Sequence, residues 1–399
     1  MYTIFILLSA IALIQRSTTV PLPQAPLSQS TNMKQQVDET TVSFLRHQAR
    51  LAKLADCLEN QDDEFTLIQQ EEEIAIISIL RDTQRTNDIA GYIGVSESDG
   101  KSVITVAFSS TRGMKDWIMN LNLLDTKPYV DRQVELCEGV QSNWSLIPSG
   151  ARIHKGFYKA FEAVAEQIED VLRGFKMLRG CDEVERVLGV GGVRFVGRSL
   201  GGAIASIASV YFANLLKPSI LVELISFGSP RFANPTFASW MGHNSLIQSY
   251  RVVNPCDLLA HVPPRSRVYQ HIPVEYFVDD TSSEDITYKC LSVNKGDEML
   301  ESPVCSNAVS WFKLGFNSHN YFRVEDCPSE CPDENGGVKI LVNARGVMIF
   351  AASNTDKYDQ AKRMLLAVQV PTYHLFVVSD AEITIAFDGS LNVIPRLLR

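Results

Sequence analysis

The pattern of apolar and polar residues through the middle of the chain predicts strands that alternate with helices. Residues 156–175 repeat apolar side chains with the period of a helix, and residues 42–58 carry a similar stripe. Short apolar runs predict a hairpin about the Asp-Gly turn of 90–108 and strands at 193–197, 220–230 and 249–254. This alternation is typical of a mainly parallel sheet with helices on both faces.

Both ends of the chain differ from this pattern. Residues 4–14 form an apolar run with the length of a signal peptide, too short to span a bilayer. They predict a signal peptide at 1–20; the alternative is an apolar first strand or helix. The polar, proline-containing residues 21–41 predict a linker or pro-segment, and the main domain is expected at 42–331. Residues 332–399 predict strands, a helix and a hairpin, which indicates a small C-terminal α+β extension.

Composition and charge narrow the classes of function. The 399 residues, 45% of them hydrophobic, can bury a full-sized core. The formal net charge of −9 argues against a nucleic-acid partner, which normally requires a basic patch. Beyond the predicted signal peptide no run of 18 apolar residues occurs, so the mature chain is expected to have no transmembrane anchor.

Cysteine usage favours export from the cell. All eight cysteines follow the predicted signal peptide, which is typical of secreted, disulfide-bonded proteins. Cys327 and Cys331 could suit zinc by their spacing, but no second Cys/His pair lies near them in sequence, so neither a metal nor a cofactor is expected. The sequon at Asn143 predicts N-glycosylation of a surface loop.

The strongest chemical signal is Gly-Arg-Ser-Leu-Gly at 197–201. Ser199 stands between a predicted strand and a predicted helix of small residues, the context in which a serine nucleophile is raised on a sharp turn. The helix N-terminus directs backbone N–H groups at that point, and Leu200 would donate the first oxyanion hydrogen bond. The alternative is a serine that only caps the helix.

A serine nucleophile requires a base, and the base requires a group that orients it. In sheets of this class the order along the chain is serine, acid, histidine. Asp257 follows a predicted strand, and His319 lies in a later loop. His261 and His271 are the competing candidates for the base.

Several blocks of the sequence together resemble the class 3 lipases, the fungal-type triacylglycerol lipases with an α/β-hydrolase fold. The resemblance covers residues from about Cys57 to Cys327 and implies that Ser199 is the nucleophile, Asp257 the orienting acid and His319 the general base. The blocks that carry it stand in the family's order: HKGFYKAF, VRFVGRSLGGAIASIA, SFGSPRFANPTFASW, YRVVNPCDLLAHVPP, YQHIPVEYFV and SHNYF.

The same resemblance implies an oxyanion loop and a lid. It aligns Thr111 with the second oxyanion residue and Trp117 with the tryptophan of a short lid over 111–124. The chain departs from the family at two places. Ser109 and Ser110 replace the usual Arg-Gly, and Arg198 stands where histidine is most frequent beside the nucleophile. By the same analogy, the disulfides expected are Cys57–Cys327 and Cys290–Cys305.

The function expected is therefore that of a secreted serine carboxylester hydrolase, a lipase that cleaves acylglycerols at a lipid–water interface. A lid with an apolar face would cover the site in water and contact lipid at an interface. Three alternatives stay open: a phospholipase A1, a feruloyl-type esterase, and a non-catalytic lipid-binding protein on the same scaffold.

Overall fold

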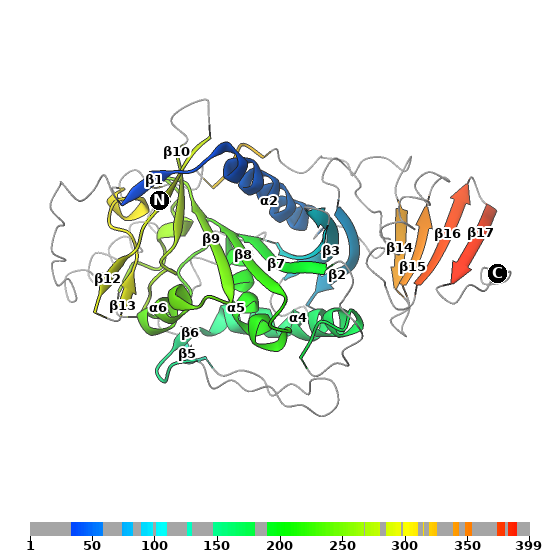
Figure 1. Ribbon diagram of the computed structural model, residues 1–399, viewed down its shortest axis with the longest axis horizontal. Helices are drawn as coiled ribbons and strands as arrows, with labels where there is room; N and C mark the ends of the chain where they lie inside the picture. Colours follow the sequence, from blue (N-terminus) through cyan, green and yellow to red (C-terminus); the bar gives the residue numbers. More distant parts are fainter. Residues whose placement is uncertain are drawn as a thin grey trace, which may run out of the picture.

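A nine-stranded sheet forms the centre of the protein, with the strand order β1-β11-β10-β9-β8-β7-β4-β3-β2 (Figure 1). The computed structural model describes residues 33–58, 74–82, 89–98, 101–109, 126–129, 147–179, 190–266, 268–279, 285–296, 298–309, 314, 319–324, 338–342, 348–352, 373–379 and 382–388. The predicted signal peptide lies outside these residues.

The five central strands run parallel, and the strands at both edges are antiparallel. The parallel set is β4 (Lys101–Phe108), β7 (Val190–Arg198), β8 (Leu221–Phe227), β9 (Ile247–Val253) and β10 (Glu275–Asp279). The antiparallel strands are β3 (Ala90–Ser98) and β2 (Ile74–Arg81) at one edge, and β11 (Ile286–Cys290) and β1 (Lys34–Gln36) at the other. The predicted hairpin and the three predicted central strands are confirmed.

Helices cover both faces of the sheet, as the sequence predicts (Figure 1). Alternate side chains of a strand point to opposite faces. On β8, Val222 and Leu224 belong to the apolar cluster that includes α4 (Lys155–Gly174) and α5 (Leu200–Leu215), whereas Ile225 and Phe227 belong to the cluster of α2 (Glu39–Leu58). Helix α6 (Pro235–His243) contributes Phe237 and Met241 to the same apolar cluster as α4 and α5.

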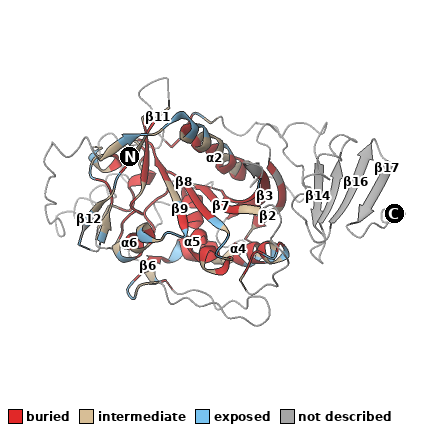
Figure 2. Cartoon of the chain, in the orientation of Figure 1, coloured by how far each residue is buried: buried red, intermediate tan, exposed pale blue. Residues whose placement is uncertain are grey.

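Helix α5 is buried on nearly all sides, as Figure 2 shows. Its sequence is apolar and small around the whole circumference, which suits a helix enclosed between the sheet and α4. By contrast, the outer faces of α2 and α4 carry exposed positions (Figure 2). No helix in the part of the chain that the structure describes has the length and apolar character needed to cross a membrane.

Regular secondary structure is present in residues that the sequence analysis assigns to the linker. Residues 34–36, assigned to the linker, form the edge strand β1, and α2 already begins at Glu39. The reason is pairing with a distant partner: Lys34–Gln36 lies antiparallel to Tyr288–Cys290 of β11. Polar residues are accommodated there because an edge strand exposes much of its surface.

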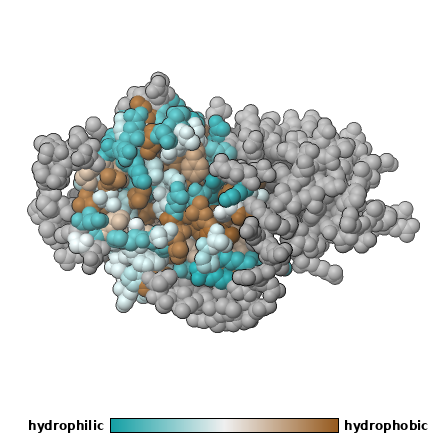
Figure 3. Space-filling model, viewed as in Figure 1, coloured by the Kyte–Doolittle hydropathy of each residue, from teal (hydrophilic) through white to brown (hydrophobic). Residues whose placement is uncertain are grey.

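Short elements complete the main unit. Two small hairpins pair β5 (Thr126–Pro128) with β6 (Arg152–His154) and β12 (Val293–Lys295) with β13 (Glu298–Leu300). Two 3₁₀ turns, η3 (Leu259–His261) and η4 (Ser306–Ala308), lie in the chain after β9 and after β13. On the face drawn in Figure 3, hydrophobic and hydrophilic residues of the described surface are interspersed.

The C-terminal residues form a separate four-stranded sheet in the order β14-β15-β16-β17 (Figure 1). Its strands are β14 (Val338–Val342), β15 (Met348–Ala352), β16 (Tyr373–Ser379) and β17 (Glu382–Asp388). The outer pairs are antiparallel and the central pair is parallel. The helix predicted in this region lies outside the described residues.

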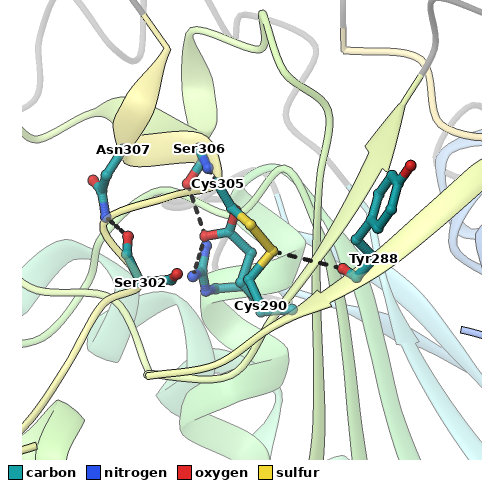
Figure 4. The surroundings of a disulfide bond; sticks show 8 residues. Tyr288, Cys290, Ser302, Cys305, Ser306 and Asn307 are labelled. Carbon is teal, nitrogen blue, oxygen red and sulfur yellow. Dashed lines mark hydrogen bonds and ion pairs between the residues drawn. A yellow bond between two sulfur atoms is a disulfide. The ribbon is translucent and has the colours of Figure 1, made fainter. Parts of the chain in front are cut away.

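A disulfide joins Cys290 at the end of β11 to Cys305 beside η4 (Figure 4). This pairing, implied by the resemblance, is confirmed. Next to it, the buried carboxylate of Glu275 accepts hydrogen bonds from the backbone N–H and hydroxyl of Ser306, at 2.8 and 2.7 Å. The same carboxylate forms an ion pair with Arg251 at 2.8 Å. The crosslink therefore holds the η4 loop against a buried charged pair.

Two further cysteines are described. Cys57 is disulfide-bonded, and its partner lies outside the described residues, as does Cys327. Cys256 is a free thiol. Glu275 lies close to the sulfur atoms of Cys290 and Cys305, but cysteine binds a metal as a thiolate, and these two sulfurs are bonded to each other.

Removal of the Cys290–Cys305 crosslink should lower the free energy of unfolding. The bond closes a loop with a sequence separation of 15 residues, for which loop-closure entropy gives about 3 kcal/mol. Urea unfolding of the Cys290→Ala/Cys305→Ala variant would measure the loss. Cys256→Ala, which removes a free thiol, is the control and should change stability by about 0.5 kcal/mol or less. A double variant as stable as the wild type would contradict this assignment.

Candidate active site

Ser199 occupies a strained turn between β7 and α5. Its backbone has φ 57° and ψ −127°, a region that residues with a side chain rarely adopt and that costs about 1–3 kcal/mol. The turn is held from the neighbouring strand, because the Ser199 N–H donates to the carbonyl of Phe227 at 2.9 Å. The strand–turn–helix context expected for Gly-x-Ser-x-Gly is therefore present.

The two glycines of the motif allow close backbone approach. A Cβ atom on Gly201 would overlap the carbonyl oxygens of Phe108 and Ser109, so the end of β4 lies directly against the first turn of α5. A Cβ atom on Gly197 would overlap the carbonyl of Gly201. Leu200 is the first residue of α5, where N–H groups have no acceptor within the helix and the helix dipole favours negative charge.

Asp257, which follows β9, is fully buried with both carboxylate oxygens engaged. Oδ1 accepts a hydrogen bond from the Leu259 N–H at 2.9 Å. Oδ2 accepts from Nδ1–H of His319 at 2.8 Å and from the hydroxyl of Tyr321 at 2.5 Å. Three donors thus compensate the loss of hydration of this carboxylate.

Tyr321 completes this group, although sequence reasoning did not identify it. Burial raises the pKa of its hydroxyl well above the usual value, and the negative charge of Asp257 raises it further. The phenol therefore remains protonated and continues to donate to Asp257. The signal in the sequence was its place two residues after His319, in the block SHNYF.

The ring of His319 is in contact with the acid. Its Nδ1–H donates to the Asp257 carboxylate. Its Nε2 is buried and has no hydrogen-bond partner among the described residues. Gly228 shows how close the strand ends are: it follows Phe227, the acceptor of the Ser199 N–H, and a side chain there would overlap both Asp257 and His319. Asp257 and His319 are therefore in contact beside the turn that carries Ser199.

The two competing histidines have other surroundings. The ring nitrogens of His261 lie 2.7 Å from the carbonyl of Asp257 and 2.9 Å from that of Ser306. Nε2–H of His271 donates to the carbonyl of Ala260 at 2.8 Å. Burial, with the nearby Arg251 and Arg231, holds the pKa of His271 well below its usual value. Both rings therefore form hydrogen bonds with backbone carbonyls in and around the loop after Asp257.

A buried ion pair supports the same loop. The guanidinium of Arg231 forms two hydrogen bonds with the Glu301 carboxylate, at 2.9 and 2.8 Å. It also donates to the carbonyls of His261 and Pro263, at 2.8 and 3.0 Å. Burial opposes ionisation of Glu301, but the Arg231 charge and hydrogen bonds outweigh it and hold the pKa of Glu301 well below its usual value. The carboxylate remains charged and keeps Arg231 on the loop.

The predicted oxyanion loop begins at Ser109, the first departure from the family pattern. Its backbone N–H donates to the carbonyl of Ala90 at 2.9 Å, and its hydroxyl accepts from the Ala90 N–H at 3.3 Å. The start of the loop is thus tied to the first residue of β3. The other predicted site residues of this region, Thr111 and Trp117, lie outside the described residues, as does Asn143.

Part of the chain is similar in sequence to known lipases. Residues 105–267 match the family model described as lipase (class 3). A lipase of Rhizomucor miehei is 26% identical over 234 residues, which cover 58% of this chain and 54% of that protein. A secreted mono- and diacylglycerol lipase of Fusarium solani is 27% identical over 187 residues, 46% of each chain. The chain spans about half the length of these relatives.

The fold is also found among solved structures. One is a triacylglycerol lipase whose catalytic centre is formed by a serine protease triad. It superposes with a TM-score of 0.52 at 21% sequence identity, covering 72% of this chain and 95% of that one. The expected α/β-hydrolase fold is confirmed by this likeness together with the parallel central sheet and its two helical layers.

Acid should destabilise the fold partly through His271. Its pKa is lowered on folding, so below about pH 6.5 the unfolded chain binds a proton that the native chain does not. The free energy of unfolding therefore decreases as the pH is lowered. One such proton contributes at most about 1.4 kcal/mol per pH unit. Urea unfolding at pH 7.5 and 5.5 should show a smaller loss for His271→Gln than for the wild type.

The exposed His243 supplies the control for this measurement. His243→Gln should keep the wild-type difference between the two pH values. If His271→Gln lost as much stability as the wild type between pH 7.5 and 5.5, His271 would not be the group that takes up the proton.

Proposed function

Residues 105–267 match the class 3 lipase family model, and from this premise we propose that the chain is a secreted serine carboxylester hydrolase that cleaves acyl chains from acylglycerols. The observation that carries the proposal is the buried Asp257–His319 contact of 2.8 Å beside the strained turn of Ser199. Such a serine, histidine and acid arrangement is recognised by geometry and roles.

In the proposed reaction, the Ser199 hydroxyl oxygen attacks the ester carbonyl while Nε2 of His319 takes up its proton. Asp257 holds Nδ1–H and stabilises the imidazolium that forms. The backbone N–H of Leu200 and the Thr111 group would donate to the oxyanion. The C–O bond to the alcohol then breaks, and His319 returns the proton to the leaving alcohol. Water attacks the acyl-enzyme in the same way, which releases the fatty acid and restores Ser199.

Acylglycerols are the proposed substrates because the relatives are named as lipases, one of them a mono- and diacylglycerol lipase. Trp117 would belong to a lid whose apolar face contacts the lipid surface. A phospholipase A1 and a feruloyl-type esterase would use the same three residues on another ester. These alternatives differ in the substrate and are therefore separated by assay.

Secretion and domain organisation are part of the proposal. The apolar run at 4–14 would act as a signal peptide, and Asn143 would carry a glycan outside the cell. The relative from Fusarium solani is named as secreted. Residues 42–331, extended by the strand at 34–36, would form the catalytic domain, and residues 332–399 a separate unit.

The proposal predicts that Ser199→Ala abolishes ester hydrolysis. Removal of the nucleophile of a triad lowers kcat by about 10⁶-fold. The purified, oxidised chain from about residue 21 and its Ser199→Ala variant should be assayed on an emulsified long-chain triglyceride and on a soluble short-chain ester. We expect Ser199-dependent turnover that rises sharply once the triglyceride forms an interface.

Other outcomes would redirect the assignment. Turnover of the soluble ester alone would favour a small-ester or feruloyl-type esterase, and turnover of a phospholipid alone would favour a phospholipase. Turnover that is equal in Ser199→Ala would refute the nucleophile. Absence of turnover on every ester, together with failure of a phosphonate probe to label Ser199, would favour the lipid-binding alternative.

Tyr321→Phe should lower kcat by about 10-fold with the same substrates. The substitution removes one of the two donors to Oδ2 of Asp257, and a hydrogen bond to a charged group contributes about 1.5–3 kcal/mol. Tyr288→Phe, on β11, is the matched control and should retain wild-type kcat. Unchanged kcat in Tyr321→Phe would mean that Leu259 and His319 alone keep Asp257 in place.

A further inference from the structure

The segment that carries His319 has no regular secondary structure in the described residues 319–324. Its backbone is held by side chains from other elements. The His319 carbonyl accepts a hydrogen bond from Nη1 of Arg198 at 3.3 Å, and the next carbonyl, that of Asn320, accepts from Nδ2 of Asn254 at 2.7 Å. Two adjacent carbonyls thus fix the direction of the chain at the imidazole.

Arg198 is itself fixed by a second contact. Nη2 of its guanidinium lies 2.7 Å from Oδ2 of Asp56, and the two side chains are only 19% and 11% exposed. Asp56 lies in the last turn of α2, next to the disulfide-bonded Cys57. An ion pair with little exposure and a covalent crosslink beside it keeps its geometry better than a surface pair. Arg198 therefore connects α2 to the loop of His319.

The fork of the guanidinium suits this connection. Two different nitrogens of Arg198 reach two partners on separate elements. Arginine presents several donors in a rigid plane, whereas lysine has one nitrogen and the shorter histidine ring carries no such fork. The positive charge of Arg198 also acts on the hydroxyl of Tyr321. Burial and Asp257 raise the pKa of Tyr321, and Arg198 lowers it by a smaller amount.

We infer that the Asp56–Arg198 pair is a positioning pair that holds the backbone of His319, and with it the imidazole, in register between Asp257 and Ser199. The inference rests on the proposed function, in which His319 is the general base. Neither side chain of the pair is given a role at the substrate. Their contribution is the placement of the base, to which catalysis is sensitive at the scale of 1 Å.

The test compares four variants of the full chain on a soluble short-chain ester and by one-dimensional proton NMR. The NMR signal is the downfield resonance of the Nδ1 proton between His319 and Asp257. Arg198→Met and Arg198→His should lower kcat by about 10- to 100-fold with KM within about threefold of the wild type, and should broaden or remove the resonance. Asp56→Asn, which keeps the shape, should lower kcat by about 3- to 10-fold.

Arg46→Met is the matched control. Arg46 lies on the same helix and pairs with Asp285 at 3.1 Å, so its loss removes an α2 anchor that does not contact the His319 carbonyl. It should keep kcat within about twofold and leave the resonance unchanged. If Arg198→Met does not fold, Asp56→Asn carries the comparison. Wild-type kcat and an unchanged resonance in Arg198→Met, Arg198→His or Asp56→Asn would overturn the inference.

Failure of the proposed function is distinguishable from failure of the positioning pair. If turnover does not depend on Ser199, the proposed function is wrong. The NMR resonance alone then tests whether the Asp56–Arg198 pair positions His319. Its loss in Arg198→Met, with retention in Arg46→Met, would still support the positioning of His319. Its retention in both would refute it.

Discussion

The site depends on one constraint, the turn at Ser199. Strand β7 must end and α5 must begin at a residue with positive φ, and the surrounding packing must stabilise that conformation. Gly201 allows α5 to approach the carbonyls at the end of β4, and the Ser199 N–H bonds to the end of β8. The parallel strands are therefore aligned at their carboxyl ends, and the loops that follow them meet at one edge of the sheet.

Burial of charge beside this turn imposes a second requirement. A carboxylate such as Asp257 can lose its hydration only if donors replace the water. A backbone N–H, a phenol and an imidazole supply them. Behind them, the paired charges of Arg231 and Glu301 hold the loop after Asp257 through its carbonyl oxygens. The polar network thus holds a loop whose only regular element among the described residues is the short 3₁₀ turn η3.

Much of this arrangement could be predicted from the sequence because its causes are local. The periodicity at 156–175 and the apolar run before Ser199 specify their elements directly. Strand β1 was missed because its polar residues become ordered only by pairing with β11, some 250 residues later in the chain. His261 and His319 both follow Asp257 in the sequence, and only the folded chain shows that the ring of His319 contacts the Asp257 carboxylate, whereas that of His261 contacts the Asp257 carbonyl. Long-range contacts of this kind leave no periodic signal.

The two departures from the class 3 pattern, at Ser109–Ser110 and at Arg198, show that different side chains can serve the same purpose in a site. What the site requires is that certain backbone positions stay fixed, and any side chain with a donor or acceptor at the right place can meet that requirement. Ser109 does so over a short distance, through the adjacent strand β3. Arg198 does so over a long distance and makes Asp56 of α2 part of the support of His319. Helix α2 precedes the first block of family resemblance, yet its packing on the sheet and its ion pair with Arg198 make it part of the same structural unit as the candidate triad.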